Sequence, residues 1–157
     1  MNLHLTERLK TVRLERYDTE SPVIIFPEHV VMIGGLVMQA PGHGLHTTLG
    51  GPRPVVGGCM AILVGNLHLP LVGSIEDVTP ELGPDFVQIV LHGPTVNRRH
   101  VVAIEQGRDE QGRLVVGQCV VHFDSAPPIV LLGHVGSLAE AIERGAPQPP
   151  RPQLVVS

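Results

Sequence analysis

The sequence predicts a mainly β protein: a single-domain antiparallel β-sandwich or β-barrel with one short C-terminal helix and extended N- and C-terminal arms. The chain has 157 residues, about the size of one domain. It holds no Trp, one Tyr and three Phe, so its core is built from branched aliphatic residues, which favour strands. The 18 Gly and 15 Pro are scattered between short apolar runs, at the spacing of turns in a sandwich or barrel.

We divide the chain into an N-terminal arm (residues 1–20), a β-rich domain (21–146) and a proline-rich C-terminal arm (147–157). The N-terminal arm carries two competing patterns. Leu5, Leu9 and Val12 share one face of a short helix. Val12 and Leu14 instead alternate with charged residues, as in an exposed strand. The sequence leaves both alternatives open for this arm.

Apolar runs separated by turn residues predict the strands of the β-rich domain. We expect strands at residues 23–26, 29–38, 55–64, 67–72, 86–91, 100–106, 113–123 and 129–132. Gly65-Asn66 stands where a tight hairpin turn would join two of these runs. The polar residues 107–112 predict a second hairpin. The nearly unbroken apolar run 86–91 predicts a strand that is buried on both faces.

The remaining segments predict two connections, one helix and a stiff tail. Residues 39–54 have the composition of a long functional or interaction loop, and residues 73–84 that of a turn-rich connection. A helix is predicted to begin at Ser137, which forms a capping-box pattern with Glu140, and to end at Gly145. The prolines of residues 147–152 predict an extended polyproline conformation.

Composition and charge bear on the class of partner. The 15 acidic and 11 basic residues give a net charge of -4, and no basic block interleaved with aromatic residues occurs, so we expect no nucleic-acid partner. The N-terminus carries charges where a signal peptide needs an apolar core, and no apolar stretch reaches about 18 residues. We therefore expect neither export by a signal peptide nor a membrane span.

The apolar content predicts a partner chain. Only 17% of the residues are charged, 43% are hydrophobic, and the mean hydropathy is +0.21, which is high for an isolated soluble domain. We expect another chain to cover part of this apolar surface. The predicted partners are further copies of the same chain, possibly in a trimer, and a neighbouring shell or scaffold protein.

Histidines offer the main candidates for a metal site. The chain has nine, of which His43 and His46 lie three residues apart in the glycine-rich loop. No His-Glu-x-x-His or Cys-x-x-Cys spacing accompanies them, so we predict no metal and no cofactor. Cys59 and Cys119 lie within apolar runs, which favours buried thiols over a disulfide.

Catalytic residues are not predicted either. The serines lack a Gly-x-Ser-x-Gly elbow. Acidic residues in and after the predicted connection could form a paired-carboxylate site, but a solvated acidic turn is the favoured interpretation. These residues are Glu76, Asp77, Glu81 and Asp85.

We interpret the sequence as that of a structural assembly protein, not an enzyme, that forms a symmetric homo-oligomer. The expected context is a viral particle, as a capsid or capsid-decorating subunit whose termini clasp neighbours, and otherwise the cytoplasm. Leu154, Val155 and Val156, the apolar tip of the tail, are the predicted contact residues. One alternative is a His-lined β-barrel that acts as a metal-dependent enzyme or binds a small ligand. Another is a sensor or regulatory β-module.

Overall fold

The protein is mainly β, as the sequence predicts. The structure, a computed structural model, describes residues 9–38, 53–89 and 93–145, without the side chains of residues 37, 38 and 53–55. Two α-helices occur in this part of the chain, α1 (Ile75–Leu82) and α2 (Val135–Arg144). The strands are β1 (Val12–Glu15), β2 (Pro22–Ile25), β3 (Val30–Met38), β4 (Arg53–Leu63), β5 (Leu67–Val72), β6 (Phe86–Gln88), β7 (Thr95–Asn97), β8 (Val101–Arg108), β9 (Leu114–Phe123) and β10 (Ile129–Leu132).

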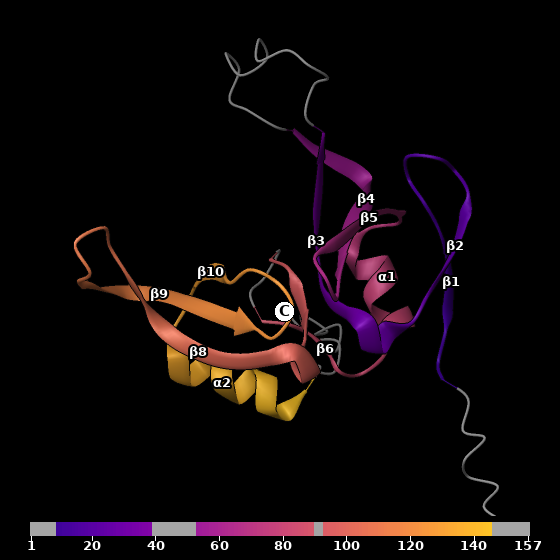
Figure 1. Cartoon of the computed structure of the whole chain (residues 1–157). Coiled ribbons are helices and arrows are strands. Elements are labelled where there is room, and N and C mark those ends of the chain that lie inside the picture. The colour runs from indigo at the N-terminus through magenta and orange to yellow at the C-terminus, as the bar shows by residue number, and fades with distance from the viewer. Residues whose placement is uncertain (1–8, 39–52, 90–92, 146–157) are drawn as a thin grey trace, which may run out of the picture.

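The strands form three antiparallel sheets (Figure 1). One sheet is the hairpin β1–β2, the second has the order β5-β4-β3-β7-β6, and the third has the order β10-β9-β8. None of the sheets closes into a barrel among the described strands. The choice between sandwich and barrel stays a prediction, whereas the antiparallel β class is confirmed.

Both predicted hairpins are confirmed. Strands β4 and β5 pair from Leu63 opposite Leu67 onward, and Gly65 and Asn66 at the turn have φ of 83° and 60°. These left-handed values are those that Gly and Asn adopt most readily. Of the polar residues 107–112, Gly107 and Arg108 end β8, and residues 109–112 lie in the turn that leads into β9.

The N-terminal strand alternative is confirmed for Val12–Glu15, which pairs with β2. Val12 is buried in the core, so this part of the predicted arm packs against the domain. The predicted strand at 86–91 ends at Gln88, and residues 90–92 lie outside the described part. Strand β7, which no apolar run announces, follows at Thr95–Asn97.

The prediction of a single helix is wrong, because residues 75–82 also form one. Ser74 caps α1: its side chain accepts a hydrogen bond from the Asp77 amide at 3.1 Å, and the Asp77 carboxylate accepts one from the Ser74 amide at 3.2 Å. This reciprocal pair satisfies two amides that a helix leaves free. Pro80 inside the segment argues against a helix in sequence, but capping and burial of Val78 and Leu82 outweigh it.

The predicted start of the C-terminal helix is also wrong. Helix α2 begins at Val135 after His134, which makes no side-chain capping bond, so Ser137 lies inside the first turn. The predicted end is confirmed, because Gly145 follows the last turn with φ 84° and donates its amide to Ile142.

The chain folds as two successive copies of one arrangement. Each half has a two-stranded hairpin, a 3-10 helix, three antiparallel strands and an α-helix, in that order. The 3-10 helices are η2 (Pro27–His29) and η4 (Arg98–His100). We call residues 12–82 the first half and residues 86–144 the second half. The first half lies at the right of Figure 1 and most of the second half at the lower left.

Matching backbone bonds confirm this correspondence. Gly73 donates its amide to Gly57 O at 2.7 Å, and Gly133 donates to Gly117 O at 2.8 Å. Gly57 and Gly117 have nearly equal φ values, 77° and 80°, in the left-handed region that favours glycine. The two halves therefore share backbone geometry as well as element order.

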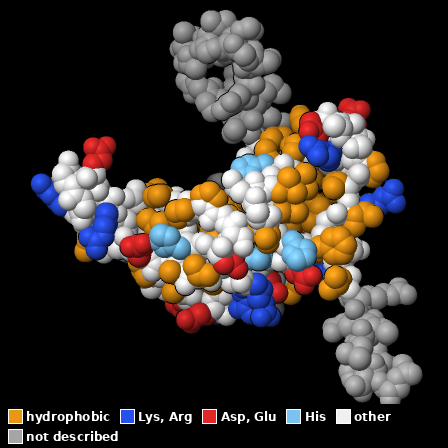
Figure 2. Space-filling view, viewed as in Figure 1, with side chains coloured by type: hydrophobic (Ala, Val, Ile, Leu, Met, Phe, Trp, Pro, Cys, Tyr) orange, Lys and Arg blue, Asp and Glu red, His pale blue; other side chains and the backbone are white. Residues whose placement is uncertain are grey.

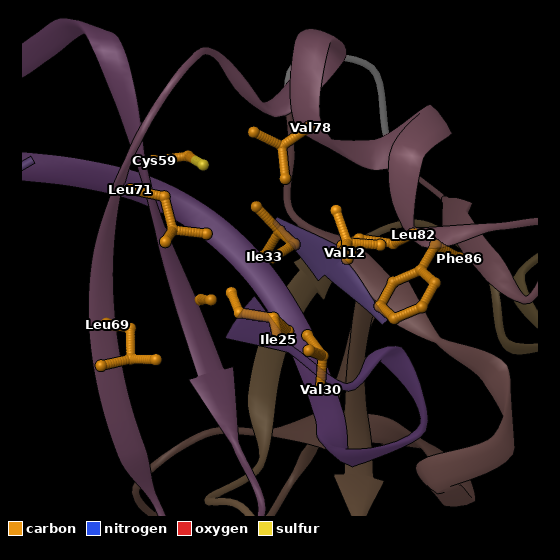
Figure 3. Packing of buried hydrophobic residues seen from close by; sticks show 11 residues of the cluster. Val12, Ile25, Val30, Ile33, Cys59, Leu69, Leu71, Val78, Leu82 and Phe86 are labelled. Carbon is orange, nitrogen blue, oxygen red and sulfur yellow. The ribbon is translucent and has the colours of Figure 1, made fainter. Parts of the chain in front are cut away.

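The first half holds an apolar core on the side that carries α1. In the first half, side chains from β1 to β5 and from α1 pack together with Phe86 of β6 (Figure 3). A second cluster joins the halves, because Val31 and Met32 of β3 pack with Val96, Val121 and other residues of the second half. The favourable free energy of burying such side chains grows with the apolar surface area removed from water, and it is the main term that favours folding.

Asn97 holds the two halves together by hydrogen bonds. Its side chain is buried, and its Nδ2 donates to the carbonyls of Val30 at 2.8 Å and Pro27 at 3.4 Å. Its Oδ1 accepts the Arg99 amide at 3.0 Å, which caps η4. One amide side chain thus links β7 to the start of β3.

We expect Asn97→Ala to lower the free energy of unfolding by about 1–3 kcal/mol, because it leaves buried backbone groups without partners. Urea denaturation followed by circular dichroism measures this loss. Gln111→Ala, in the exposed β8–β9 turn, is the control and leaves the unfolding midpoint unchanged. Equal midpoints for both variants would contradict the role given to Asn97.

Candidate functional site

The candidate metal ligands and contact residues that the sequence singles out fall outside the described part. The candidate metal ligands His43 and His46 lie in the segment 39–52. The candidate contact residues Leu154, Val155 and Val156 lie in the segment 146–157. The structure tests neither prediction.

Several described histidines make separate pairs with neighbouring groups. His100 donates Nε2–H to the Glu28 carbonyl at 2.7 Å, and its Nδ1 lies 2.8 Å from Asp124 Oδ1. His122 pairs with Glu105 across β8 and β9. Within residues 9–38, 53–89 and 93–145, no three His, Cys, Asp or Glu side chains lie close enough together to hold a metal ion.

Both cysteines are free and buried, as the sequence predicts. Burial raises the pKa of the Cys59 thiol to about 11, and the nearby carboxylates Asp77 and Glu76 add to the shift. Burial likewise raises the pKa of Cys119, whose thiol donates to the Gly133 carbonyl at 3.0 Å. Because the thiolate is the reactive form, neither side chain suits nucleophilic chemistry.

We expect native protein at pH 8 to release almost no thionitrobenzoate from Ellman's reagent, because both thiols are buried and protonated. The same protein in concentrated urea should release two equivalents per chain. Absorbance measures both reactions. One fast-reacting thiol in the native state would contradict the burial of Cys59 or Cys119.

Asp85 is the one predicted acidic candidate that joins a polar network in the described residues. Its carboxylate accepts hydrogen bonds from Arg98 at 3.1 Å and Arg99 at 3.3 Å. Arg98 also donates to the carbonyls of Ile142 and Glu143 at the end of α2. Arg98, Arg99 and Ile142 line an open hollow of about 190 Å³. Of the other acidic candidates, Asp77 caps α1 with its carboxylate.

Burial alone would raise the pKa of Asp85, but the hydrogen bonds from Arg98 and Arg99 outweigh it and hold this pKa below its usual value. The network therefore stabilises the fold above the pKa of an ordinary aspartate, and this stabilisation is lost as the pH falls through the lowered pKa. With its charge matched by two arginines, the site is a structural clamp between η4 and α2.

We expect wild-type protein to lose more stability than Asp85→Asn when the pH falls from 6 to about 3, because only the wild type loses an ionised carboxylate. Urea midpoints at several pH values measure this difference. Glu110→Gln, in the exposed β8–β9 turn, is the control and should follow the wild type. Parallel curves for wild type and Asp85→Asn would contradict the clamp.

Large apolar side chains are exposed on the strands. Figure 2 shows hydrophobic side chains over a broad part of the visible face, with charged ones gathered in smaller groups. Those exposed on strands are Ile24, Val56, Leu67, Val72, Val102, Leu114, Val116, Val130 and Leu132. The composition predicts such a surface, whereas its location depends on the fold.

Six of these side chains lie on edge strands: Leu67 and Val72 on β5, Val130 and Leu132 on β10, Ile24 on β2 and Val102 on β8. The internal pairing of the chain sets the edges of β2 and β8 apart. Among the described strands, β2 has only β1 as a neighbour and β8 has only β9. Ile24 of β2 and Val102 of β8 are each about three-fifths exposed, at 61% and 62%. An unpaired edge with exposed apolar side chains is a template for another strand. We take these two edges as the candidate functional site.

Comparisons with known proteins give no further assignment. No protein family, curated protein or solved structure matches the chain. In the described residues, no helix is long and apolar enough to cross a membrane.

Proposed function

We propose that the protein is a structural assembly protein that forms a homo-oligomer. One observation carries this proposal: the strand edges of β2 and β8 are unpaired among the described strands and carry exposed apolar side chains. Free backbone amides and carbonyls on such edges pair with another strand, and burial of the apolar side chains adds to the affinity.

The surface chemistry supports a protein partner. Contact with water is unfavourable for the exposed apolar side chains of β2 and β8. Exposed patches of this kind mark interaction surfaces. Arg98, in the 3-10 helix that precedes β8, forms an ion pair with Asp85. The edges thus offer hydrophobic contact and backbone hydrogen bonds rather than a charged site.

The viral particle as the setting of the assembly stays a prediction from the sequence, as does a shell or scaffold neighbour. So does the clasping role of Leu154, Val155 and Val156, which lie outside the described part. The described histidines do not favour the metal-dependent alternative, because His68, His100 and His122 pair with an amide, carboxylates and a carbonyl.

We expect the full chain at micromolar concentration and neutral pH to show a mass that is a multiple of 16.8 kDa in size-exclusion chromatography with light scattering. The reason is that the apolar edges are covered only in the assembly. The chain unfolded in urea is the control and should give the mass of one chain. A native mass of one chain throughout the micromolar range would overturn the proposal.

A further inference from the structure

We infer that copies of this chain associate head to tail, with the edge of β8 in one copy receiving β2 of the next copy. This inference rests on the proposed function and names the contact that builds the assembly. The contact repeats the joint that the chain already forms between its own halves, where β3 receives β7.

The internal joint defines the geometry. Strand β3 pairs with β7 through Met32 opposite Val96 and Ile33 opposite Thr95. By the repeat, β3 corresponds to β8 and β7 corresponds to β2. Both counterpart strands have a free edge among the described strands. The unused edges are therefore the two sides of a joint that the fold forms once.

The β8 side of the expected contact is exposed where the internal joint is buried. Val31 of β3 is 0% exposed because it packs against the second half, whereas its counterpart Val102 is 62% exposed. Met32 is buried, and its counterpart Ala103 is exposed. Strand β8 thus presents the side chains of a joint without the cover.

The β2 side shows the same contrast. Thr95 of β7 is 1% exposed, whereas its counterpart Ile24 is 61% exposed. Asn97 is buried at the joint, and its counterpart Phe26 is exposed. Each polar residue at the internal joint is replaced here by a large apolar one, so the free surface favours burial in a further contact.

The 3-10 helices extend this contrast. His100 of η4 is largely covered because its Nε2 donates to the Glu28 carbonyl of η2, across the internal joint. Its counterpart His29 is exposed. In a head-to-tail contact, His29 reaches the η4 backbone of the neighbouring copy in the same way.

The first hairpin has the shape that this contact requires. Within β6–β7, Val87 lies opposite Val96, and within β1–β2, Val12 lies opposite Ile25. Ile25 and Val96 each precede the histidine of their 3-10 helix by the same interval. β2 can therefore replace β7 in register, which places Ile25 opposite Ala103 and Ile24 opposite Ile104.

A comparison of the two helices also indicates that the second half is uncovered at its free end. Leu82 of α1 is buried beside Phe86, a residue of the second half (Figure 3). Its counterpart Ile142 of α2 is only half-buried and lines the open hollow with Arg98 and Arg99. The second half thus lacks, at its free end, the cover that it supplies to the first half.

A second copy fits both surfaces at once, because each surface is the counterpart of one side of the internal joint. The β2 and β8 edges differ from one another, so the contact is heterologous and produces rings or filaments rather than a two-fold dimer. The occupant of β8 is accordingly the β1–β2 hairpin of the next copy.

Disulfide trapping between two differently mutated chains tests the contact. One chain carries Ile24→Cys and the other Ile104→Cys, the pair that the repeat places opposite each other. Directly opposed residues of antiparallel strands lie within disulfide reach. We expect a cross-linked dimer on non-reducing gels from the mixture only, because each variant alone lacks the complementary thiol and the native cysteines are buried.

The control replaces Ile104→Cys by Val116→Cys. Val116 and its counterpart Val56 are both largely exposed, so the joint covers this position in neither half. Cross-linking of Ile24→Cys to Val116→Cys with equal yield would overturn the pairing. Cross-linking of either edge variant to a second copy of itself would also overturn the pairing. A third contrary outcome is a disulfide within one chain that carries both Ile104→Cys and Val155→Cys, because it would show that the chain's own tail occupies the β8 edge.

A charged side chain on the β8 edge provides a second test, in which the assembled fraction is measured and no new disulfide is needed. We expect Val102→Lys to reduce the assembled fraction at least tenfold, whereas Val116→Lys leaves it unchanged, at equal folded content by circular dichroism. An unchanged assembled fraction for Val102→Lys would overturn the inference. If the chain assembles but neither the cross-link nor the charge effect appears, only this contact fails; if it does not assemble, the proposed function itself fails.

Discussion

The pairing of β3 with β7 is the constraint on which the structure depends. It joins strands of the two halves into one five-stranded sheet. Asn97 strengthens it with buried hydrogen bonds to the carbonyls of Val30 and Pro27. Buried polar groups of this kind specify one arrangement, because any other leaves them without partners. The joint therefore fixes which strand edges are used and which stay free.

A repeated unit that pairs with its own copy has an inherent consequence for function. Two units make one joint and leave one unmatched edge at each end, here on β2 and β8. In repeat proteins the terminal units are usually modified to cover such faces. In this chain the end residues Ile24 and Val102 stay apolar and exposed, which favours further association over a closed monomer.

The sequence predicted the local features well. The strands, the Gly65-Asn66 turn, the β8–β9 hairpin and the Gly145 helix end each depend on short-range patterns. These patterns do not predict the repeat, although the sequence carries its signal: His-Val-Val occurs at residues 29–31 and 100–102, and Val-Gly-x-Cys at 56–59 and 116–119. Helix α1 was missed because Pro80 conceals a capping box completed by Asp77 in place of Glu or Gln.

By itself the sequence determined the β class, the buried thiols and an excess of apolar surface, because these follow from composition and from neighbours along the chain. Only the tertiary structure decided where that surface lies. Val31 and Val102 occupy the same place in the same short motif, yet one is buried and the other exposed. The difference arises from β7, a strand distant in sequence, which pairs with the edge of β3. Among the described strands, none pairs with the corresponding edge of β8.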